Sequence, residues 1–387
     1  MQDDGFRYLS RNFICLWAAN FLYFGSFYLL LPTLSPYAAA LGASTFQVGL
    51  VMGFFTFASV TIRPQCGVMA GIYGRRPVML AGVGFFSLVF FLYAVVDDVY
   101  VLYAVRALHG LGHAAFLAAA AAYIADLAPV ERRGEVIGYY SLSNIISMAV
   151  FPAVGVAWMK YSQDDFTGLV WGGGAIALVA WAFVAGLQEC STQESRRPGA
   201  SLRQVAVRTE VWASSLALWS GALCYGVVIT FLPLFAPSRG IEDFGIFFSV
   251  NAVSTVVSRA VAGKVSDRIG RKKVIVPFML VMAAAMIFLA QVTSAWELAV
   301  AGALFGFGLG AYFPVLNALV VDHTPLRDRG TALGFFTSFM DVGIASGAVV
   351  LGFAGEYLGY DAMFFWGAGI LFLTVFVFAN AVKSERK

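Results

Sequence analysis

Charge is what this sequence has least of. Only 12% of its 387 residues are charged and 60% are hydrophobic, whereas soluble domains carry about 25% charged residues. A water-soluble fold has no means of burying this much apolar surface, so the composition excludes an ordinary soluble domain. It indicates instead a multi-pass integral membrane protein surrounded by a lipid bilayer.

Cysteine is also scarce. The four cysteines, Cys15, Cys66, Cys190 and Cys224, show no paired spacing, so we expect neither a disulfide framework nor a metal site. The net charge of +3 does not indicate nucleic-acid binding, because the basic residues gather in particular loops, as a topology signal does. Nucleotide-binding and hydrolase motifs are missing as well. We therefore predict no cofactor, no nucleic-acid partner and no enzymatic activity.

Long apolar runs are what the sequence does contain. A helix needs about 20 apolar residues to cross a bilayer, and these unbroken runs lack the alternation of β-barrel strands. The sequence therefore predicts an all-α fold with twelve transmembrane helices. We expect them at residues 13–34, 45–69, 77–96, 99–125, 136–159, 167–188, 211–235, 243–265, 273–294, 296–321, 331–354 and 361–382.

The distribution of basic residues predicts the orientation. With both termini in the cytoplasm, nearly all Lys and Arg of the loops lie inside, and only Lys160 and Arg239 lie outside. The longest polar stretch then joins two halves on the cytoplasmic side. We predict an N-terminal six-helix bundle at 1–188, a cytoplasmic linker at 189–210 and a C-terminal six-helix bundle at 211–387. We expect a monomer in a bacterial inner (cytoplasmic) membrane.

The two halves repeat each other at an offset of 196 residues, as in the step from Arg63 to Arg259. Glycines, arginines and an aspartate recur in this register. Further matched pairs are Gly67 and Gly263, Gly74 and Gly270, Arg75 and Arg271, Gly110 and Gly306, Gly112 and Gly308, and Asp126 and Asp322. The repeat predicts two pseudo-symmetric bundles, with a solute site between them near the midplane and alternating access by rocking.

The strongest motifs lie in the loops after the second and eighth spans. Residues 67–76 read GVMAGIYGRR, residues 263–273 read GKVSDRIGRKK, and Arg106 begins a glycine-rich turn in the fourth span. These segments resemble the signature loop and the intramembrane arginine motif of the major facilitator superfamily. The resemblance implies tight turns and a conformational gate on the cytoplasmic side. The gate residues would be Gly67, Gly74, Arg75, Arg76, Gly263, Asp267, Arg268, Gly270 and Arg271.

The sequence departs from that family in two places. Gly71 stands where the family has an acidic residue, so a latch between the halves would depend on Asp267. The fifth span has only Phe151-Pro152-Ala-Val-Gly155, where drug/proton antiporters of the family have a fuller glycine-proline motif.

Ionisable residues inside the membrane are costly and mark functional sites. At 100° per residue, Arg106, His109 and His113 fall on one face of the fourth helix. Arg106 is expected to bind anionic solute groups or tune a neighbour, and either histidine could carry a proton; the alternative is that all three only tie helices together. Asp341 is a second candidate for proton coupling, or else a structural partner of Asn144 or Asn251. Arg63 and Arg259 are expected at the cytoplasmic interface.

Several other residues belong to helices that line the central cavity in the resembled family. Together they would form an aromatic pocket with a few polar groups, suited to an amphipathic solute. They are Asn20, Tyr23, Trp219, Tyr225, Tyr312, Phe313 and Asn317.

The sequence as a whole favours a secondary active transporter that exports a small organic or amphipathic solute in exchange for protons. Two alternatives use the same scaffold: a proton-coupled importer of a sugar or metabolite, and an exporter of a small metal-chelating metabolite. A receptor or scaffold with a transporter-like fold is a further possibility.

Overall fold

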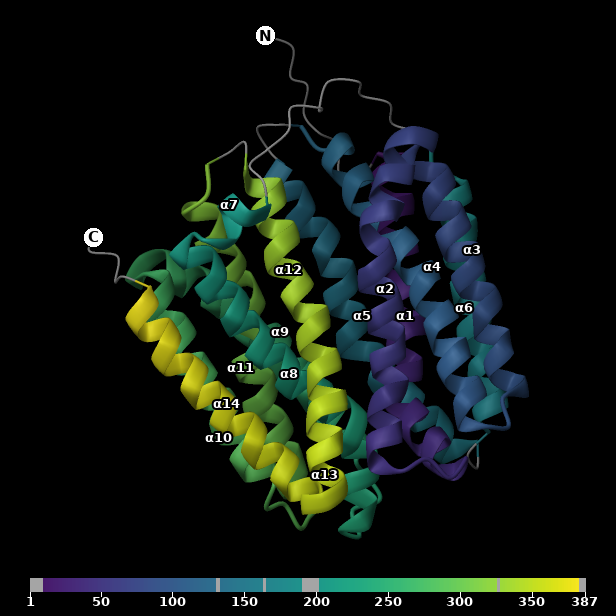
Figure 1. The fold of residues 1–387 in the computed structure, drawn as a ribbon, viewed down its shortest axis with the longest axis vertical. Coiled ribbons are helices and arrows are strands. Elements are labelled where there is room, and N and C mark those ends of the chain that lie inside the picture. Colours follow the sequence, from purple (N-terminus) through teal and green to yellow (C-terminus); the bar gives the residue numbers. More distant parts are fainter. Residues whose placement is uncertain (1–9, 130–132, 163–164, 190–201, 326–327, 383–387) are drawn as a thin grey trace. The chain divides into compact units, whose positions relative to one another are not determined.

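The computed structural model describes residues 10–129, 133–162, 165–189, 202–325 and 328–382. These residues are helical or lie in short connections, with no strand among them (Figure 1). Twelve of the described helices are long and apolar enough to cross a membrane. The predicted all-α fold with twelve spans is confirmed.

The helices follow the predicted spans in order. The first half contains α1 (Arg11–Ala40), α2 (Thr45–Tyr73), α3 (Arg75–Leu92), the 3₁₀ turn η1 (Tyr93–Val95), α4 (Val99–Leu127), α5 (Arg133–Tyr161) and α6 (Phe166–Ala185). The second contains α7 (Leu202–Ala206), α8 (Thr209–Ser238), α9 (Gly245–Ile269), α10 (Arg271–Leu289), α11 (Ala295–Asp322), α12 (Arg329–Ser346), η4 (Gly347–Leu351), α13 (Gly352–Leu358) and α14 (Tyr360–Ala381).

The ends of the helices differ from the predicted spans where local chemistry overrides hydropathy. Helix α1 continues through Pro32 and Pro36 to Ala40, beyond the expected end at residue 34, because neighbouring helices in membranes can accommodate proline. Three of the described helix starts lie within one residue of the predicted ones and are set by capping side chains: Asp98 accepts from the backbone N–H of Tyr100 at 2.7 Å, Asp165 caps α6, and Ser294 caps α11.

The eleventh span is interrupted by a π-helical turn that the sequence did not predict. This turn, η4, follows α12 and precedes α13. It lies where backbones come very close, because a Cβ atom on Gly347 would overlap the carbonyl oxygen of Leu223 in α8. A Cβ atom on Gly49, at the start of α2, would overlap the carbonyl oxygen of Ala348 in the same turn. Such a turn depends on these contacts and has no hydropathy signature.

The chain divides into two compact units. Unit 1 comprises residues 1–37 and 54–196, and unit 2 comprises residues 38–53 and 197–387. The start of α2 thus belongs to unit 2, whereas the sequence-predicted division places it in the first bundle. Most of the predicted linker, residues 190–201, lies outside the described residues, and α7 forms part of the remainder.

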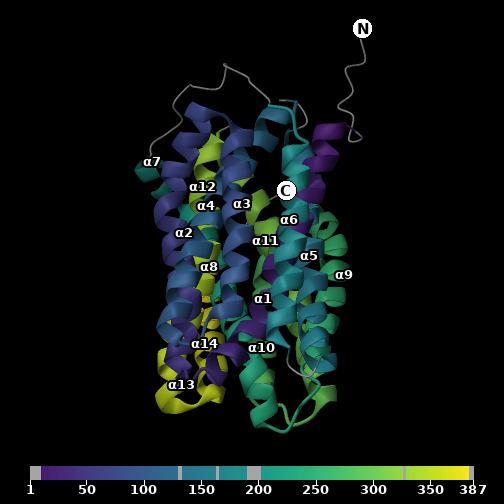
Figure 2. The same cartoon turned by 90° about the vertical axis from the view of Figure 1, so that its right-hand side faces the viewer.

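Each unit has its own set of packed helices. In unit 1, α3 packs against both α4 and α6 (Figure 2). In unit 2, α9 packs against α11, α8 against α12, and α10 against both α11 and α14 (Figure 1). The internal repeat is therefore expressed as two helical units, each with its own core.

The sequence repeat is also a repeat of helix packing. A Cβ atom on Gly110 would overlap the carbonyl oxygen of Phe55, and one on Gly306 would overlap that of Asn251. Since Phe55 and Asn251 are themselves 196 residues apart, both units bring the same two backbones together at the same position. Close approach of this kind is the usual role of glycine between membrane helices.

Candidate functional site

A stripe of polar side chains on α4 lies buried inside unit 1. Arg106 and His109 are completely inaccessible to solvent, and His113 is 5% exposed. The three residues follow one face of the helix, as their spacing predicted. Burial of an arginine and two histidines among membrane helices is costly unless polar partners surround them.

Arg106 is held by an aromatic ring and a phenol. Its guanidinium carbon lies 4.3 Å from the centre of the Phe55 ring of α2, a cation–π contact. Its Nη1 atom donates to the hydroxyl oxygen of Tyr93 at 3.5 Å. Tyr93 is fully buried in the η1 turn that follows α3, so α2, η1 and α4 together position this cation.

His109 shares the same phenol. The hydroxyl of Tyr93 lies 3.0 Å from Nδ1 of His109, and the imidazole ring packs 3.9 Å from the ring centre of Phe86. The other ring nitrogen, Nε2, is buried and has no hydrogen-bond partner among the residues that the structure describes. In His109, Nδ1 is therefore bonded to Tyr93, whereas Nε2 is bonded to none of the described residues.

His113 is positioned by a second tyrosine. The hydroxyl of Tyr23, on α1, lies 2.8 Å from Nδ1 of His113, and the ring of Phe27 stacks on the imidazole at 5.2 Å. Tyr23 itself is fully buried and packs 4.1 Å from Phe116. The structure thus brings four predicted residues, Tyr23, Arg106, His109 and His113, into one aromatic-walled cluster.

Tyr93, which links Arg106 to His109, was not predicted from the sequence. It lies at the end of the predicted third span, thirteen positions before Arg106. The only available signal was a tyrosine in an apolar run, since a buried phenol almost always has a hydrogen-bond partner.

Asn20 has a different set of partners in unit 1. Its amide nitrogen donates to Ser143 Oγ at 2.6 Å, and its amide oxygen accepts from the hydroxyl of Tyr140 at 2.7 Å. Ser147 adds a hydrogen bond to the carbonyl oxygen of Phe21. Asn20 thus takes part in polar packing between α1 and α5.

In unit 2 the predicted cavity residues lie on α8 and α11. Trp219 donates to Ser346 Oγ at 3.0 Å, which ties α8 to the end of α12. The hydroxyl of Tyr312 accepts from the backbone N–H of Gly221 at 3.1 Å and contacts Ser220 Oγ at 3.3 Å. Both hydrogen-bonded groups therefore join helices within unit 2.

The remaining predicted residues of unit 2 lie on α8, α11 and α12. Tyr225 is buried on α8, Phe313 packs 5.8 Å from Phe336, and Asn317 is partly buried on α11. Asp341 is partly buried in the middle of α12. Asn251, one partner considered for Asp341, is buried on α9 beside Gly306.

The signature loops form the same ion pair in both units. Arg75 Nε lies 2.8 Å from Asp126 Oδ2, and Arg271 Nε lies 3.1 Å from Asp322 Oδ2. Before each arginine, Gly74 and Gly270 adopt φ angles of +101° and +97°, which glycine adopts without strain. In each loop this turn lets the arginine begin the next helix.

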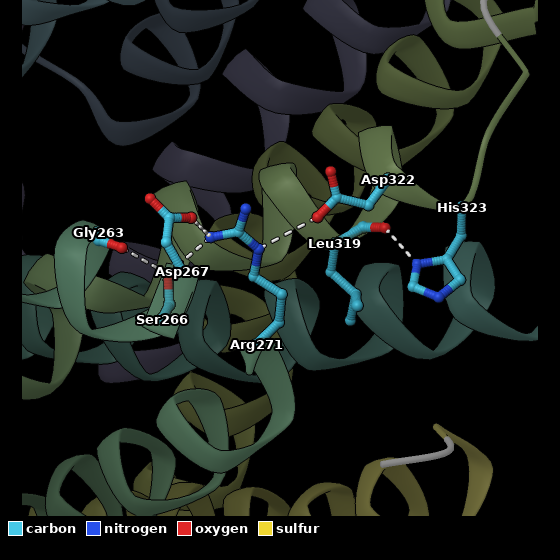
Figure 3. Close-up of polar contacts among 7 residues, drawn as sticks. All are labelled: Gly263, Ser266, Asp267, Arg271, Leu319, Asp322 and His323. Atoms are coloured by element: carbon cyan, nitrogen blue, oxygen red, sulfur yellow. Dashed lines mark hydrogen bonds and ion pairs between the residues drawn. The ribbon is translucent and has the colours of Figure 1, made fainter. Parts of the chain in front are cut away.

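The two loops differ around that ion pair. Figure 3 shows that Arg271 also contacts Ser266, at 2.7 Å, and the carboxylate of Asp267. Arg75, in contrast, donates to the carbonyl oxygen of Ala70 at 3.3 Å. Gly71 stands where unit 2 has Asp267, so unit 1 lacks the side chain that would repeat this second carboxylate contact.

Unit 1 has its own additional contact from the end of α6. The carboxylate of Glu189 accepts from the backbone N–H groups of Arg75 and Arg76 at 2.8 and 3.0 Å. Arg76 also donates to the carbonyl oxygen of Ala185 at 2.7 Å. The two bonds to Glu189 satisfy the backbone N–H groups of the first two residues of α3.

The expectation that all the motif glycines make tight turns is wrong for two of them. Gly67 and Gly263 lie inside α2 and α9, and a Cβ atom on either would meet nothing within 4 Å. Arg268 lies exposed near the end of α9. In these two loops, only Gly74 and Gly270 have a positive φ.

A family comparison agrees with this architecture. The family model of the Major Facilitator Superfamily matches residues 16–257 and 241–387. The chain belongs to this superfamily. It is therefore a multi-pass membrane transporter and not an enzyme, as the motifs predicted.

Individual proteins also resemble the chain over most of its length. The multi-drug resistance efflux pump PmrA of Streptococcus pneumoniae is 24% identical over 378 residues, covering 92% of each protein. The multidrug resistance protein MdtG of Serratia proteamaculans is 23% identical, covering 92% of this chain and 89% of MdtG. Among solved structures, a mutant of the nucleoside transporter NupG superposes with a TM-score of 0.79 at 15% identity, covering 96% and 99% of the two chains.

Proposed function

We propose that this transporter exports a small organic or amphipathic solute in exchange for protons, by alternating access, from a bacterial cytoplasmic membrane. Similarity over 92% of the chain to one protein named a multi-drug resistance efflux pump and to another named a multidrug resistance protein supports export. We also propose that the protein acts as a monomer with both termini in the cytoplasm. The positive-inside distribution of Lys and Arg supports this orientation.

The observation that carries proton coupling is the buried cluster of unit 1. Two histidines, each hydrogen-bonded to a tyrosine, lie within about two turns of a fully buried arginine on the same helix. Histidine changes charge near neutral pH. A permanently charged arginine nearby affects that protonation. We assign His109 and His113 as candidate proton carriers, with Arg106 tuning them and Asp341 as a second candidate.

The proposed solute site consists of residues predicted from the sequence. The candidate residues are Arg106 with Asn20, Tyr23, Trp219, Tyr225, Tyr312, Phe313 and Asn317. Aromatic surfaces with a few hydrogen-bonding groups suit a solute that has both apolar and polar parts. A thermal-shift screen of purified protein against drugs, sugars and metal-chelating metabolites should identify a member of the solute class.

The test of function is proton-coupled flux in reconstituted vesicles, using the strongest ligand of that screen. When a pH gradient is imposed, we expect the ligand to move in the direction opposite to the protons. We also expect the ligand to cause a proton flux that vesicles without the protein lack. A receptor or scaffold would bind the ligand and show no flux. Movement of solute with the protons, into the compartment that they enter, would identify an importer instead.

The proposed proton carriers are tested by polar variants that do not titrate. We expect His109→Gln or His113→Gln, or Asp341→Asn, to reduce pH-driven transport. The matched control is His323→Gln, because His323 is an exposed histidine at the end of α11 whose Nδ1 bonds to the carbonyl oxygen of Leu319 (Figure 3). If all three variants transport as well as the control, none of these residues carries the proton.

A further inference from the structure

Tyr93 connects Arg106, which can only donate hydrogen bonds, to His109, whose ring nitrogens can donate or accept them. Its hydroxyl oxygen lies 3.5 Å from Nη1 of Arg106 and 3.0 Å from Nδ1 of His109. All three side chains are fully buried. Bulk water therefore does not compete for these bonds, and the donors and acceptors have to match within the cluster.

The donors and acceptors of the cluster set the directions of both bonds. A guanidinium has N–H donors and no acceptor, so the oxygen of Tyr93 must accept from Arg106. The phenol also has one hydrogen to donate, and among the described residues the only acceptor it contacts is Nδ1 of His109. An imidazole nitrogen that accepts carries no hydrogen, so the hydrogen of neutral His109 is on the other nitrogen, Nε2.

We infer that Tyr93 is a positioning residue that fixes His109 as the Nε2–H tautomer and controls the entry of a second proton. This second proton can bind only to Nδ1, the atom to which Tyr93 donates. When it binds, the oxygen of Tyr93 has to accept from both His109 and Arg106, and its own hydrogen has to rotate away. The orientation of one hydroxyl thus differs between neutral and protonated His109.

The inferred tautomer also determines which groups can bind to Nε2 of His109. Nε2 is buried without a partner among the described residues, and in the inferred tautomer it carries the hydrogen. It is therefore a donor, like Arg106. Any group that approaches this nitrogen in the transport cycle has to be a hydrogen-bond acceptor, such as a carbonyl or carboxylate oxygen. This step rests on the proposed function, whereas the tautomer itself does not.

The tautomer can be measured directly, because the chain has only three histidines. In protein labelled with ¹⁵N-histidine and reconstituted in lipid, solid-state NMR distinguishes ring nitrogens that carry a hydrogen from those that do not. Single His→Gln variants assign the three sets of signals. At about pH 8, where histidine is ordinarily neutral, we expect His109 to have a protonated Nε2 and an unprotonated Nδ1. A hydrogen on Nδ1 of His109 would overturn the inference.

Two tyrosine variants separate positioning from packing. Tyr93→Phe keeps the ring and removes the hydroxyl, so the Nδ1 signal of His109 should shift and the other tautomer should appear, while the signals of His113 stay unchanged. Tyr23→Phe should do the reverse, since Tyr23 bonds to His113. Tyr312→Phe, a buried tyrosine of unit 2, should leave all three histidines unchanged. Unaltered His109 signals in folded Tyr93→Phe would also overturn the inference.

These results are independent of the proposed function. Normal pH-driven transport by His109→Gln would refute His109 as a proton carrier and leave the measured tautomer as it is. A hydrogen on Nδ1 would refute the role of Tyr93 and leave proton-coupled transport untouched.

Discussion

The two units share a backbone arrangement and differ in what they bury. The glycine contacts of α4 in unit 1 recur in α11 of unit 2, at Gly110 and Gly306. The polar positions do not recur: Arg106, His109 and His113 correspond to Gly302, Phe305 and Leu309. A Cβ atom on Gly302 would lie 2.7 Å from the carbonyl oxygen of Phe247 in α9. Unit 2 therefore has neither the polar groups nor the space of the unit 1 cluster at these positions.

This difference separates the properties of the fold from those of the site. Features present in both units, such as the helix contacts and the Arg–Asp pairs, belong to the shared architecture of the two units. Features present in one unit only, such as the Tyr–His–Arg cluster, are free to serve a specific chemistry. Variants made at matched positions of the two units test this distinction.

The largest expected effect is that of Arg106→Ala. We expect transport to fall to background, because the variant removes the cation beside both histidines. Arg239→Ala is the control, since Arg239 forms an exposed pair with Asp361, and such pairs contribute only about 0–1 kcal/mol. Transport in vesicles and the melting temperature in detergent should be measured together. Normal transport by Arg106→Ala would mean that the cluster is only a structural tie.

The next effect is on stability and should be equal in the two units. Gly110→Ala and Gly306→Ala each place a methyl group against a backbone carbonyl, and overpacking of this kind costs about 1–3 kcal/mol. Gly67→Ala and Gly263→Ala are matched controls in open space, where alanine should stabilise each helix by up to about 1 kcal/mol. Thermal unfolding in detergent measures all four. If only one of the variants Gly110→Ala and Gly306→Ala is destabilised, the helix packing is not repeated in the two units.

The sequence predicted the features that depend on local composition or on the repeat. Twelve apolar runs were long enough to cross a membrane, and hydropathy alone identified them. The matched arginines and aspartates of the loops were recognisable at the offset of 196 residues, although their pairing became visible only in the structure. The common face of Arg106, His109 and His113 followed from helical geometry.

Other features depend on contacts between distant segments. Tyr93 reaches His109 from a 3₁₀ turn at the end of a different helix, and no spacing rule predicts that approach. The π turn at η4 results from close backbone contacts with α2 and α8. Glu189 was recognisable only as the start of a polar linker, because its bonds to the N–H groups of α3 require the end of α6 to lie beside them.

A smaller effect is expected at the ion pairs of the loops. The side chain of Asp126 is 9% exposed and that of Asp322 is 45% exposed, and Arg271 has further partners in Ser266 and Asp267. Removing the charge at the less exposed position should therefore cost more. We expect Asp126→Asn to lower stability by about 1–3 kcal/mol and Asp322→Asn by less than about 1 kcal/mol. Equal shifts of the melting temperature would contradict this order.

The smallest expected effect is that of Gly71→Asp, which gives unit 1 the carboxylate that unit 2 has at Asp267. A Cβ atom on Gly71 would meet nothing within 4 Å, so Gly71→Asp fits and places a carboxylate four residues before Arg75, as Asp267 stands before Arg271. A partly exposed pair of this kind contributes about 0.2–1 kcal/mol. Gly71→Asn is the control, since it has the same shape without the charge. The gain of the aspartate variant over the asparagine variant should fall when salt is raised and vanish in the background Arg75→Gln. A gain that survives both changes would come from helix propensity at position 71, and the loops would then differ by more than one carboxylate.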